Sequence, residues 1–317
     1  MTVGHKLLCV FCILLMGVIY AEDKKPVPAA NLKGEPKEKV EEVPKGEVIR
    51  LKKFPFIAQA PEFSAEACIA MAMRGFGKRA SQYTVFNFAQ INPLEGRGLK
   101  LEEIPKVLAR LGFRPADKTK PFNLSNSMLA LAMAFHLMVA DLRQGYPSMV
   151  LVRDKDADTG KLIQRFLLVV GYSSIRDEVI VHDPKRTNGA YILIPKKDFF
   201  NMWTIPTAPG KAQAVRFLLK PWKLIDLKES NEVTPADICQ RIILVRNYSK
   251  GKVSIQISGP FVVIAPFSKE LLKQAVDQWV TPVVTAMQKS YFPKNPSIVV
   301  EIWLARTSTE YNQVLTR

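Results

Sequence analysis

Few side chains in this 317-residue chain could act as a nucleophile, a general base or a metal ligand. Beyond residue 21 there are only two cysteines, Cys68 and Cys239, and two histidines, His136 and His182. Two cysteines are too few for a disulfide framework, and a metal site built on them would need the histidines as partners. The chain has no H-E-x-x-H motif, no zinc-finger spacing and no glycine-rich phosphate loop. We therefore expect neither a metal nor another cofactor.

Three of these side chains also have a structural explanation. Cys68 lies on an apolar helical face and is predicted to be a core residue. His136 lies within an apolar helical stretch, residues 128–139, and is predicted to be a packed or surface residue without a catalytic part. His182 precedes Asp183, so on a strand the two side chains would point to opposite sides, and His182 would be a poor base beside that carboxylate.

The elements that position these residues follow from hydrophobic periodicity. Apolar residues at helical spacing predict helices over 65–76, 101–111 and 126–144, and glycines follow each of them. Apolar runs predict strands over 147–153, 165–171 and 178–182, with a turn at 154–160 between the first two. Helices first and strands afterwards indicate an α+β domain in which helices pack on an antiparallel sheet.

The N-terminal residues predict export. His5 and Lys6 precede an apolar run over residues 7–20, and Ala21 follows, which is typical of a signal peptide spanning residues 1–21. Ile19 is large for its place before the cleavage site, so retention as a signal anchor is the alternative. The run is short for a membrane span, and no stable span is expected after cleavage. Residues 22–50 hold seven acidic and seven basic residues and predict a flexible tether in a secreted or periplasmic protein.

The net charge of +16 makes a polyanionic partner a candidate, either nucleic acid, acidic lipid or an anionic wall polymer. No zinc-finger spacing or RNA-binding strand motif accompanies that charge. We therefore expect no nucleic-acid partner, and an anionic component of the cell envelope is the charge-based alternative to a peptide or protein ligand.

Residues 51–205 resemble the papain-like cysteine peptidases of the bacteriocin-processing type, which cleave after double-glycine leaders. In that family a Gln lies shortly before a nucleophilic Cys at the start of a helix, a later strand begins with the catalytic His, and an Asp-Pro element and a Phe-x-x-x-Trp motif follow. The matching segments are Gln59–Met71, Arg165–Tyr172, His182–Pro184, Gly189, and Phe199 with Trp203.

The chain departs from this family at both catalytic positions. The resemblance puts Ser64 at the nucleophile and Arg165 at the base, while Gln59 and Asp183 stand at the oxyanion-hole Gln and the base-orienting Asp. A hydroxyl is a weaker acid than a thiol and depends more on a base, and a guanidinium stays protonated and offers no lone pair. These four residues are therefore predicted to mark vestigial catalytic positions, and no residue is assigned as catalytic.

Each vestigial position has a structural interpretation. Ser64 is predicted to cap the helix over 65–76. Arg165 and Asp183 are predicted to form a salt bridge that replaces a His–Asp pair, and the alternative for Asp183 is a turn cap before Pro184. Gln59 either lines the vestigial cleft or points away from it.

The C-terminal part is predicted to be a second, smaller domain. We expect a first domain over 51–222, a linker over 223–235 and a small α+β domain over 236–317. Strands are predicted over 241–246, 252–258, 261–265 and 298–305, with a turn at 247–251, a helix over 268–289 kinked at Pro282, and a helix starting at Ser308. This order resembles the segment before the zinc helix of gluzincin-like metallopeptidases, although no H-E-x-x-H follows. The metal half is absent by design, or the sequence is a truncated relative.

These observations predict an exported pseudo-peptidase that binds peptide or protein without hydrolysing it. One alternative is an active hydrolase that uses Ser64 with an unidentified base. The other is a binder of an anionic envelope polymer.

Overall fold

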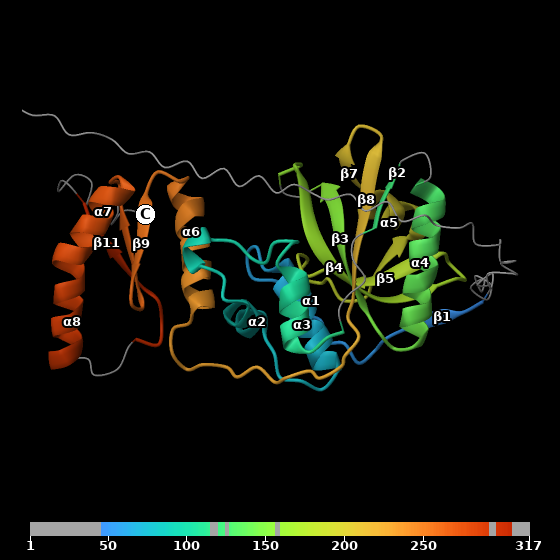
Figure 1. Cartoon of the computed structure of the whole chain (residues 1–317), viewed down its shortest axis with the longest axis horizontal. Coiled ribbons are helices and arrows are strands. Elements are labelled where there is room, and N and C mark those ends of the chain that lie inside the picture. Colours follow the sequence, from blue (N-terminus) through green and yellow to red (C-terminus); the bar gives the residue numbers. More distant parts are fainter. Residues whose placement is uncertain (1–45, 115–119, 124–126, 156–158, 292–295, 306–317) are drawn as a thin grey trace, which may run out of the picture. The chain divides into compact units, whose positions relative to one another are not determined.

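The computed structural model describes residues 46–114, 120–123, 127–155, 159–291 and 296–305 (Figure 1). Its main sheet has eight strands, and every pairing within it is antiparallel. The order is β2-β8-β3-β4-β5-β6, with β1 paired to β4 and β7 paired to β8. The strands are β1 (Val48–Arg50), β2 (Lys120–Asn123), β3 (Ser148–Lys155), β4 (Leu162–Ser173), β5 (Glu178–His182), β6 (Ile192–Pro195), β7 (Ile205–Ala208) and β8 (Lys211–Leu218).

Helices cover both faces of this sheet. Phe166 and Leu168 of β4 pack in one core with α1 (Ser64–Gly75), α2 (Gln82–Ala89) and α3 (Ile104–Leu111). Leu167 and Val169 pack in a second core with α4 (Ser127–Arg143) and α5 (Lys196–Trp203). Because both faces are covered, β4 is a continuous apolar run from Phe166 to Val170 and does not alternate. The predicted α+β class is confirmed, with helices on an antiparallel sheet followed by a smaller α/β unit.

The predicted helices and strands of the first domain are confirmed within a few residues, but the predicted tether is too long. Residues 47–50 belong to the folded part, because β1 pairs with β4 at Val48↔Ser173 and the Glu47 carboxylate forms a 2.8 Å ion pair with Arg143. The predicted signal peptide, residues 1–21, lies outside the described residues.

The segment predicted as a linker, 223–235, begins in contact with the helices. The backbone N–H groups of Trp222 and Lys223 donate to the Gly112 carbonyl, and that of Leu227 donates to the Arg79 carbonyl. Gly112 ends α3 with φ of 91°, and a Cβ there would lie 2.0 Å from the Lys223 carbonyl oxygen, so this close approach requires glycine. The domain boundaries stay a prediction.

Residues 241–246 do not form a strand, and that prediction is wrong. They lie in helix α6 (Pro235–Ser249), which also includes part of the predicted turn at 247–251. The helix begins with a capping box, in which the Thr234 hydroxyl accepts from the Asp237 N–H and the Asp237 carboxylate accepts from the Thr234 N–H. Proline at the first helical position strengthens this start.

A three-stranded sheet follows α6, with the order β11-β10-β9. Its strands are β9 (Ser254–Ser258), β10 (Phe261–Ala265) and β11 (Val300–Trp303), and β10 is parallel to β11 and antiparallel to β9. Between β10 and β11 lie α7 (Lys269–Ala275), the π-helical turn η3 (Val276–Val280) and α8 (Thr281–Ser290). Pro282 stands in the first turn of α8, directly after that π-helical turn.

Two further predictions are a C-terminal helix and the absence of a stable membrane span. The helix predicted to start at Ser308 lies outside the described residues. Among the helices that the structure describes, none has the length and hydropathy needed to cross a membrane.

Candidate functional site

Ser64 is the first residue of α1, and it is not the helix cap that was predicted. The capping position belongs to Phe63, and no side chain there accepts a hydrogen bond from the helix. The Ser64 hydroxyl oxygen accepts instead from the backbone N–H of Phe166 on β4, at 3.3 Å. This contact joins the start of α1 to the strand residue that follows Arg165.

Arg165 and Asp183 form the predicted salt bridge. The Arg165 Nη2 lies 3.0 Å from Asp183 Oδ2, and its Nε lies 3.3 Å from Oδ1, so both carboxylate oxygens are engaged. The two side chains are 7% and 3% exposed. The turn-capping alternative also holds, because Asp183 Oδ1 accepts from the backbone N–H of Lys185 at 3.2 Å. One carboxylate therefore fixes both the pair and the turn.

Two charged residues that were not predicted complete this cluster. Asp154 Oδ2 lies 3.2 Å from Arg165 Nη2, and Arg186 Nε lies 3.1 Å from Asp183 Oδ2. Asp154 was predicted to begin a turn, but β3 extends through it to Lys155. Burial lowers the pKa of Arg165, yet the hydrogen bonds and charges of Asp183 and Asp154 outweigh it and raise that pKa overall. The guanidinium stays protonated.

Gln59 is attached to the same region. Its backbone N–H donates to the Pro184 carbonyl at 2.8 Å, which places it beside the turn at Asp183. Its side-chain Oε1 is buried and has no hydrogen-bond partner among the described residues. The four predicted positions are thus linked through three contacts: Gln59 with Pro184, Arg165 with Asp183, and Ser64 with Phe166.

His182 is fully buried and cannot serve as the base. Its Nδ1 accepts from the Tyr191 backbone N–H at 3.1 Å, so the proton resides on Nε2, which lies 3.0 Å from the Phe54 carbonyl and donates to it. Burial is the main cause that lowers the pKa of His182, and the ring is neutral at pH 7. Both ring nitrogens form hydrogen bonds with backbone groups and not with Asp183. This agrees with the prediction that the His182 and Asp183 side chains point to opposite sides.

Of the remaining reactive side chains, the two cysteines are core residues and His136 is half-buried. Cys68 is fully buried, and burial, with the Asp183 charge as a smaller cause, raises the pKa of its thiol. Cys239 is also buried, and it is a free cysteine. His136 is half-buried on α4, and its Nδ1 has no partner among the described residues. The prediction that Cys68 is a core residue is confirmed.

This geometry has a chemical consequence. Within the described part of the chain, neither a carboxylate nor an imidazole forms a hydrogen bond with the Ser64 hydroxyl. Arg165 is held by two carboxylates and has no lone pair to accept a proton. A guanidinium could stabilise an alkoxide through its charge, but the proton that must leave Ser64 has no acceptor in these contacts.

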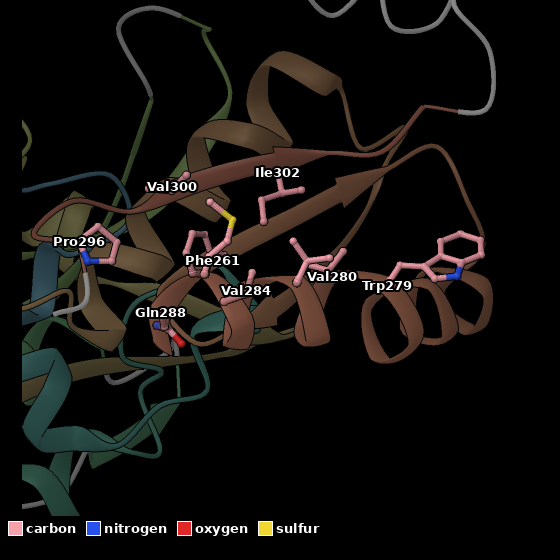
Figure 2. A pocket seen from close by; sticks show the side chains of 10 residues that line it. Phe261, Trp279, Val280, Val284, Gln288, Pro296, Val300 and Ile302 are labelled. Atoms are coloured by element: carbon pink, nitrogen blue, oxygen red, sulfur yellow. The ribbon is translucent and has the colours of Figure 1, made fainter. Parts of the chain in front are cut away.

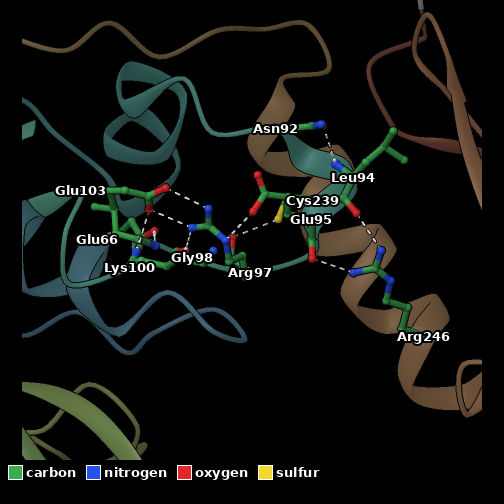
Figure 3. A network of polar contacts seen from close by, with 11 residues as sticks. Glu66, Asn92, Leu94, Glu95, Arg97, Gly98, Lys100, Glu103, Cys239 and Arg246 are labelled. Carbon is green, nitrogen blue, oxygen red and sulfur yellow. Dashed lines mark hydrogen bonds and ion pairs between the residues drawn. The ribbon is translucent and has the colours of Figure 1, made fainter.

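A second polar cluster lies two residues further along α1 (Figure 3). Glu66 is fully buried, its Oε1 accepts from the Leu99 N–H at 2.6 Å, and its Oε2 has no partner among the described residues. Burial raises the pKa of Glu66 to about 8. The neighbouring Arg97 binds both oxygens of Glu103 at 2.8 Å and accepts through its carbonyl from the Cys239 thiol of α6. No pattern in the local sequence indicates that Glu66 would be buried.

Comparisons with known proteins find similarity in structure only. No protein-family model matches the chain, and no curated protein matches it. The peptidase domain of Streptococcus ComA, a bifunctional ABC transporter involved in quorum sensing, is similar at 18% identity over 53% of this chain and 98% of that one, with a TM-score of 0.33. Xylellain, a cysteine protease from Xylella fastidiosa, is similar at 11% identity over 58% of this chain and 89% of that one, with a TM-score of 0.35.

Proposed function

We propose that this chain is an exported pseudo-peptidase with a papain-like first domain, which binds peptide or protein and does not hydrolyse it. The observation that carries the proposal is the buried Arg165–Asp183 pair, 3.0 Å between Nη2 and Oδ2, at the positions where the resemblance implies a His–Asp pair. An Arg–carboxylate pair keeps the two elements joined but removes proton transfer.

The placement of Ser64 supports the same proposal. A nucleophile at a helix N-terminus is stabilised as an anion, but its proton must first move to a base. The Ser64 hydroxyl accepts from the Phe166 N–H, and the histidine nearest in sequence to Asp183 is neutral and occupied on both nitrogens. Losing the nucleophile and the base of such a unit removes nearly all the acceleration it supplies. In these contacts, no residue could act as the base that the hydrolase alternative requires.

Active-site labelling tests this function directly. The purified chain should hydrolyse no member of a peptide library, and a fluorophosphonate probe should leave Ser64 unlabelled. The Ser64→Ala variant is the matched control for non-specific labelling, because it removes one oxygen from the first turn of α1. Stoichiometric labelling of Ser64 that disappears in Ser64→Ala would establish a serine hydrolase and contradict the proposal.

Rebuilding the catalytic pair tests the alignment behind it. The double variant Ser64→Cys with Arg165→His restores an ionisable Cys–His pair beside Asp183 and Gln59, so its thiol should alkylate with an apparent pKa below ~8.5, the ordinary value for Cys. Ser64→Cys alone, which retains Arg165, is the control for the contribution of the imidazole. If the double variant shows an ordinary thiol pKa in iodoacetamide rates measured across pH, Arg165 does not stand at the position of the family's His.

A further inference from the structure

An exposed tryptophan lies where the end of α3 meets the segment that follows β8. The Arg114 backbone N–H donates to the Lys220 carbonyl at 2.9 Å. The Gly112 carbonyl accepts from the backbone N–H groups of Trp222 and Lys223, both at 2.9 Å. The two segments therefore run side by side as a short antiparallel ladder.

The alternation of side chains along this ladder sorts them into two faces. Phe113 is 1% exposed, pairs with Pro221 in an antiparallel bridge and packs in the core. Successive side chains of a ladder point to opposite sides, so those of Arg114, Lys220 and Trp222 point outward. Arg114 and Lys220 stand opposite each other, whereas a glycine stands opposite Trp222. The indole is therefore left uncovered, and Trp222 is 66% exposed.

Two lysines pack against aromatic rings at this place. The Lys223 Nζ lies 5.6 Å from the centroid of the Trp222 ring, and the Lys220 Nζ lies 4.6 Å from that of Tyr146. Within the described part of the chain, neither lysine nor Arg114 forms an ion pair with a carboxylate. Arg114, Lys220, Trp222 and Lys223 are called the Trp222 surface below.

The elements that border the Trp222 surface carry little negative charge. Residues 104–114, which include α3, contain three basic residues and no acid, and residues 220–227 contain two Lys and one Asp. Two nearby carboxylates are already engaged in ion pairs, Asp226 with Lys78 and Asp141 with Arg216. The two acids at 102–103 lie at the other end of α3, roughly 13 Å away along the helix axis. The positive charge is therefore local to this surface.

An anionic lipid surface is the partner that fits these side chains. An indole suits the boundary between head groups and acyl chains, because it combines an apolar body with a polar N–H. Lysine and arginine beside it attract the anionic head groups. Ile225 adds a 39% exposed aliphatic side chain to the same segment. Such a side chain gains from contact with acyl chains but offers no stacking face to a sugar or a base.

We propose that the Trp222 surface docks this chain on an anionic phospholipid surface, with the indole at the head-group boundary and the three cations on the phosphates. The contact uses side chains of one exposed region and is peripheral. The proposal goes beyond the proposed function, because it adds a second binding surface and uses none of the vestigial catalytic positions.

A second exposed tryptophan offers a matched control. Trp279 is also 66% exposed, and it lines an apolar groove between α8 and β11 in the C-terminal unit (Figure 2). The groove has a volume of about 520 Å³, and nine of its ten lining residues are apolar, with Gln288 the exception. The helix lies toward β9, where the Thr281 hydroxyl is 3.2 Å from that of Ser258, and leaves Ile302 of β11 only half-buried. None of the lining residues is charged, so the two tryptophans differ in the cations beside them.

Quenching of tryptophan fluorescence by brominated lipid provides the measurement. Vesicles of brominated phosphatidylglycerol and phosphatidylcholine should quench the full chain, and vesicles of brominated phosphatidylcholine alone should quench it far less. Trp222→Phe should remove the quenching, whereas Trp279→Phe should leave it in place. Residues 1–45 contain no tryptophan, so vesicle binding through the N-terminal apolar run would not by itself produce this signal.

Charge variants test the contribution of the cations. Lys223→Gln and Arg114→Gln should each raise the lipid concentration for half-maximal quenching about fivefold, which is the contribution of one cation near an anionic surface. Two positions protect the test against one variant that fails to fold. Lys252→Gln, at an exposed position just before β9, removes one charge elsewhere. It should change that concentration by less than about twofold, because distant charges are screened.

Four outcomes would overturn the proposal. They are no quenching by the anionic vesicles, equal quenching by the neutral ones, equal shifts in Lys223→Gln and Lys252→Gln, and quenching that Trp279→Phe removes and Trp222→Phe does not. The last outcome would place the membrane contact at the groove. Binding of soluble dextran sulfate that Lys223→Gln weakens, without quenching by vesicles, would also overturn it and would assign the Trp222 surface to a soluble anionic polymer.

Discussion

The cluster of charged residues around the Arg165–Asp183 pair, called the Arg165 cluster below, and the groove beside α8 differ in how completely their side chains are buried and paired. In the Arg165 cluster, Arg165 and Asp183 are nearly fully buried, and Asp154 and Arg186 add further ion pairs. In the groove, Trp279 and Val283 remain more than half exposed, although both line an apolar cavity. The comparison indicates that the Arg165 cluster is a buried structural contact, whereas the groove leaves large apolar side chains open to solvent.

Burial explains why the two regions should respond differently to substitution. A buried charge that loses its partner keeps the full cost of desolvation, so the Arg165 cluster tolerates little change. An exposed apolar side chain contributes little to the free energy of folding because it is hardly buried, so substitution there affects folding little and binding more. Stability measurements therefore test the Arg165 cluster, and binding measurements test the groove.

The largest expected effect is in the Arg165 cluster. Arg165→Ala should destabilise the chain by about 3–5 kcal/mol, because it leaves the Asp183 carboxylate buried and without its main partner. Urea denaturation of Arg165→Ala, Asp183→Ala and the double variant gives the coupling energy of the pair. Arg241→Ala, which breaks the more exposed pair with Glu301, is the control and should cost under ~1 kcal/mol. A coupling of zero would show that Arg165 and Asp183 contribute independently.

The second-largest expected effect is at Glu66, whose contribution to the free energy of unfolding should depend on pH. Its folded-state pKa of about 8 lies above the ordinary value of 4.5, so between these pH values the folded chain keeps a proton that the unfolded chain has released. The free energy of unfolding therefore falls as pH rises through this window, by about 1.4 kcal/mol per pH unit. Glu66→Gln cannot ionise and should exceed the native chain in stability by about 3 kcal/mol at pH 7.

The measurement is urea denaturation of both proteins at several pH values. Glu103→Gln serves as the control. The hydrogen bond from Arg97 lowers the pKa of Glu103, so the contribution of Glu103 to stability should rise with pH, opposite to that of Glu66. Parallel stability curves for Glu66→Gln and the native chain would show that Glu66 does not retain a proton on folding.

Much of the fold could be predicted because the relevant signals are local, whereas the pairing of Arg165 with Asp183 was predicted from the family resemblance, which puts these residues at the positions of a His–Asp pair. Strong periodicity followed by glycine defined the helix that ends at Gly112. The same local reasoning failed for α6, where Ile242, Ile243 and Val245 favour a strand. The capping box at Thr234 was present in the sequence and outweighs that preference, since β-branched residues lower helix propensity only slightly.

The features that were missed depend on tertiary contacts. The burial of Glu66 follows from the approach of the loop at Gly98, where a Cβ would lie 2.9 Å from each Glu66 carboxylate oxygen. The role of Asp154 required β3 to continue past the expected turn. The groove depends on where a helix settles over a three-stranded sheet, and no periodicity in one helix reports which strand it leaves uncovered.

The smallest expected effect is in the groove, and it decides whether its wall is open to solvent. Val283→Thr replaces a methyl group with a hydroxyl of similar size at a 58% exposed position and should change stability by no more than about 0.5 kcal/mol. Val263→Thr makes the same change on β10, where the side chain is fully buried, and should cost about 1–3 kcal/mol because the hydroxyl loses water. Val and Thr have similar helix propensities and both favour strands, so the difference between the two positions mainly reports burial. Urea denaturation of the two variants measures it. Equal losses would mean that Val283 is covered in solution, and the contrast between the buried Arg165 cluster and an open groove would then fail at the groove.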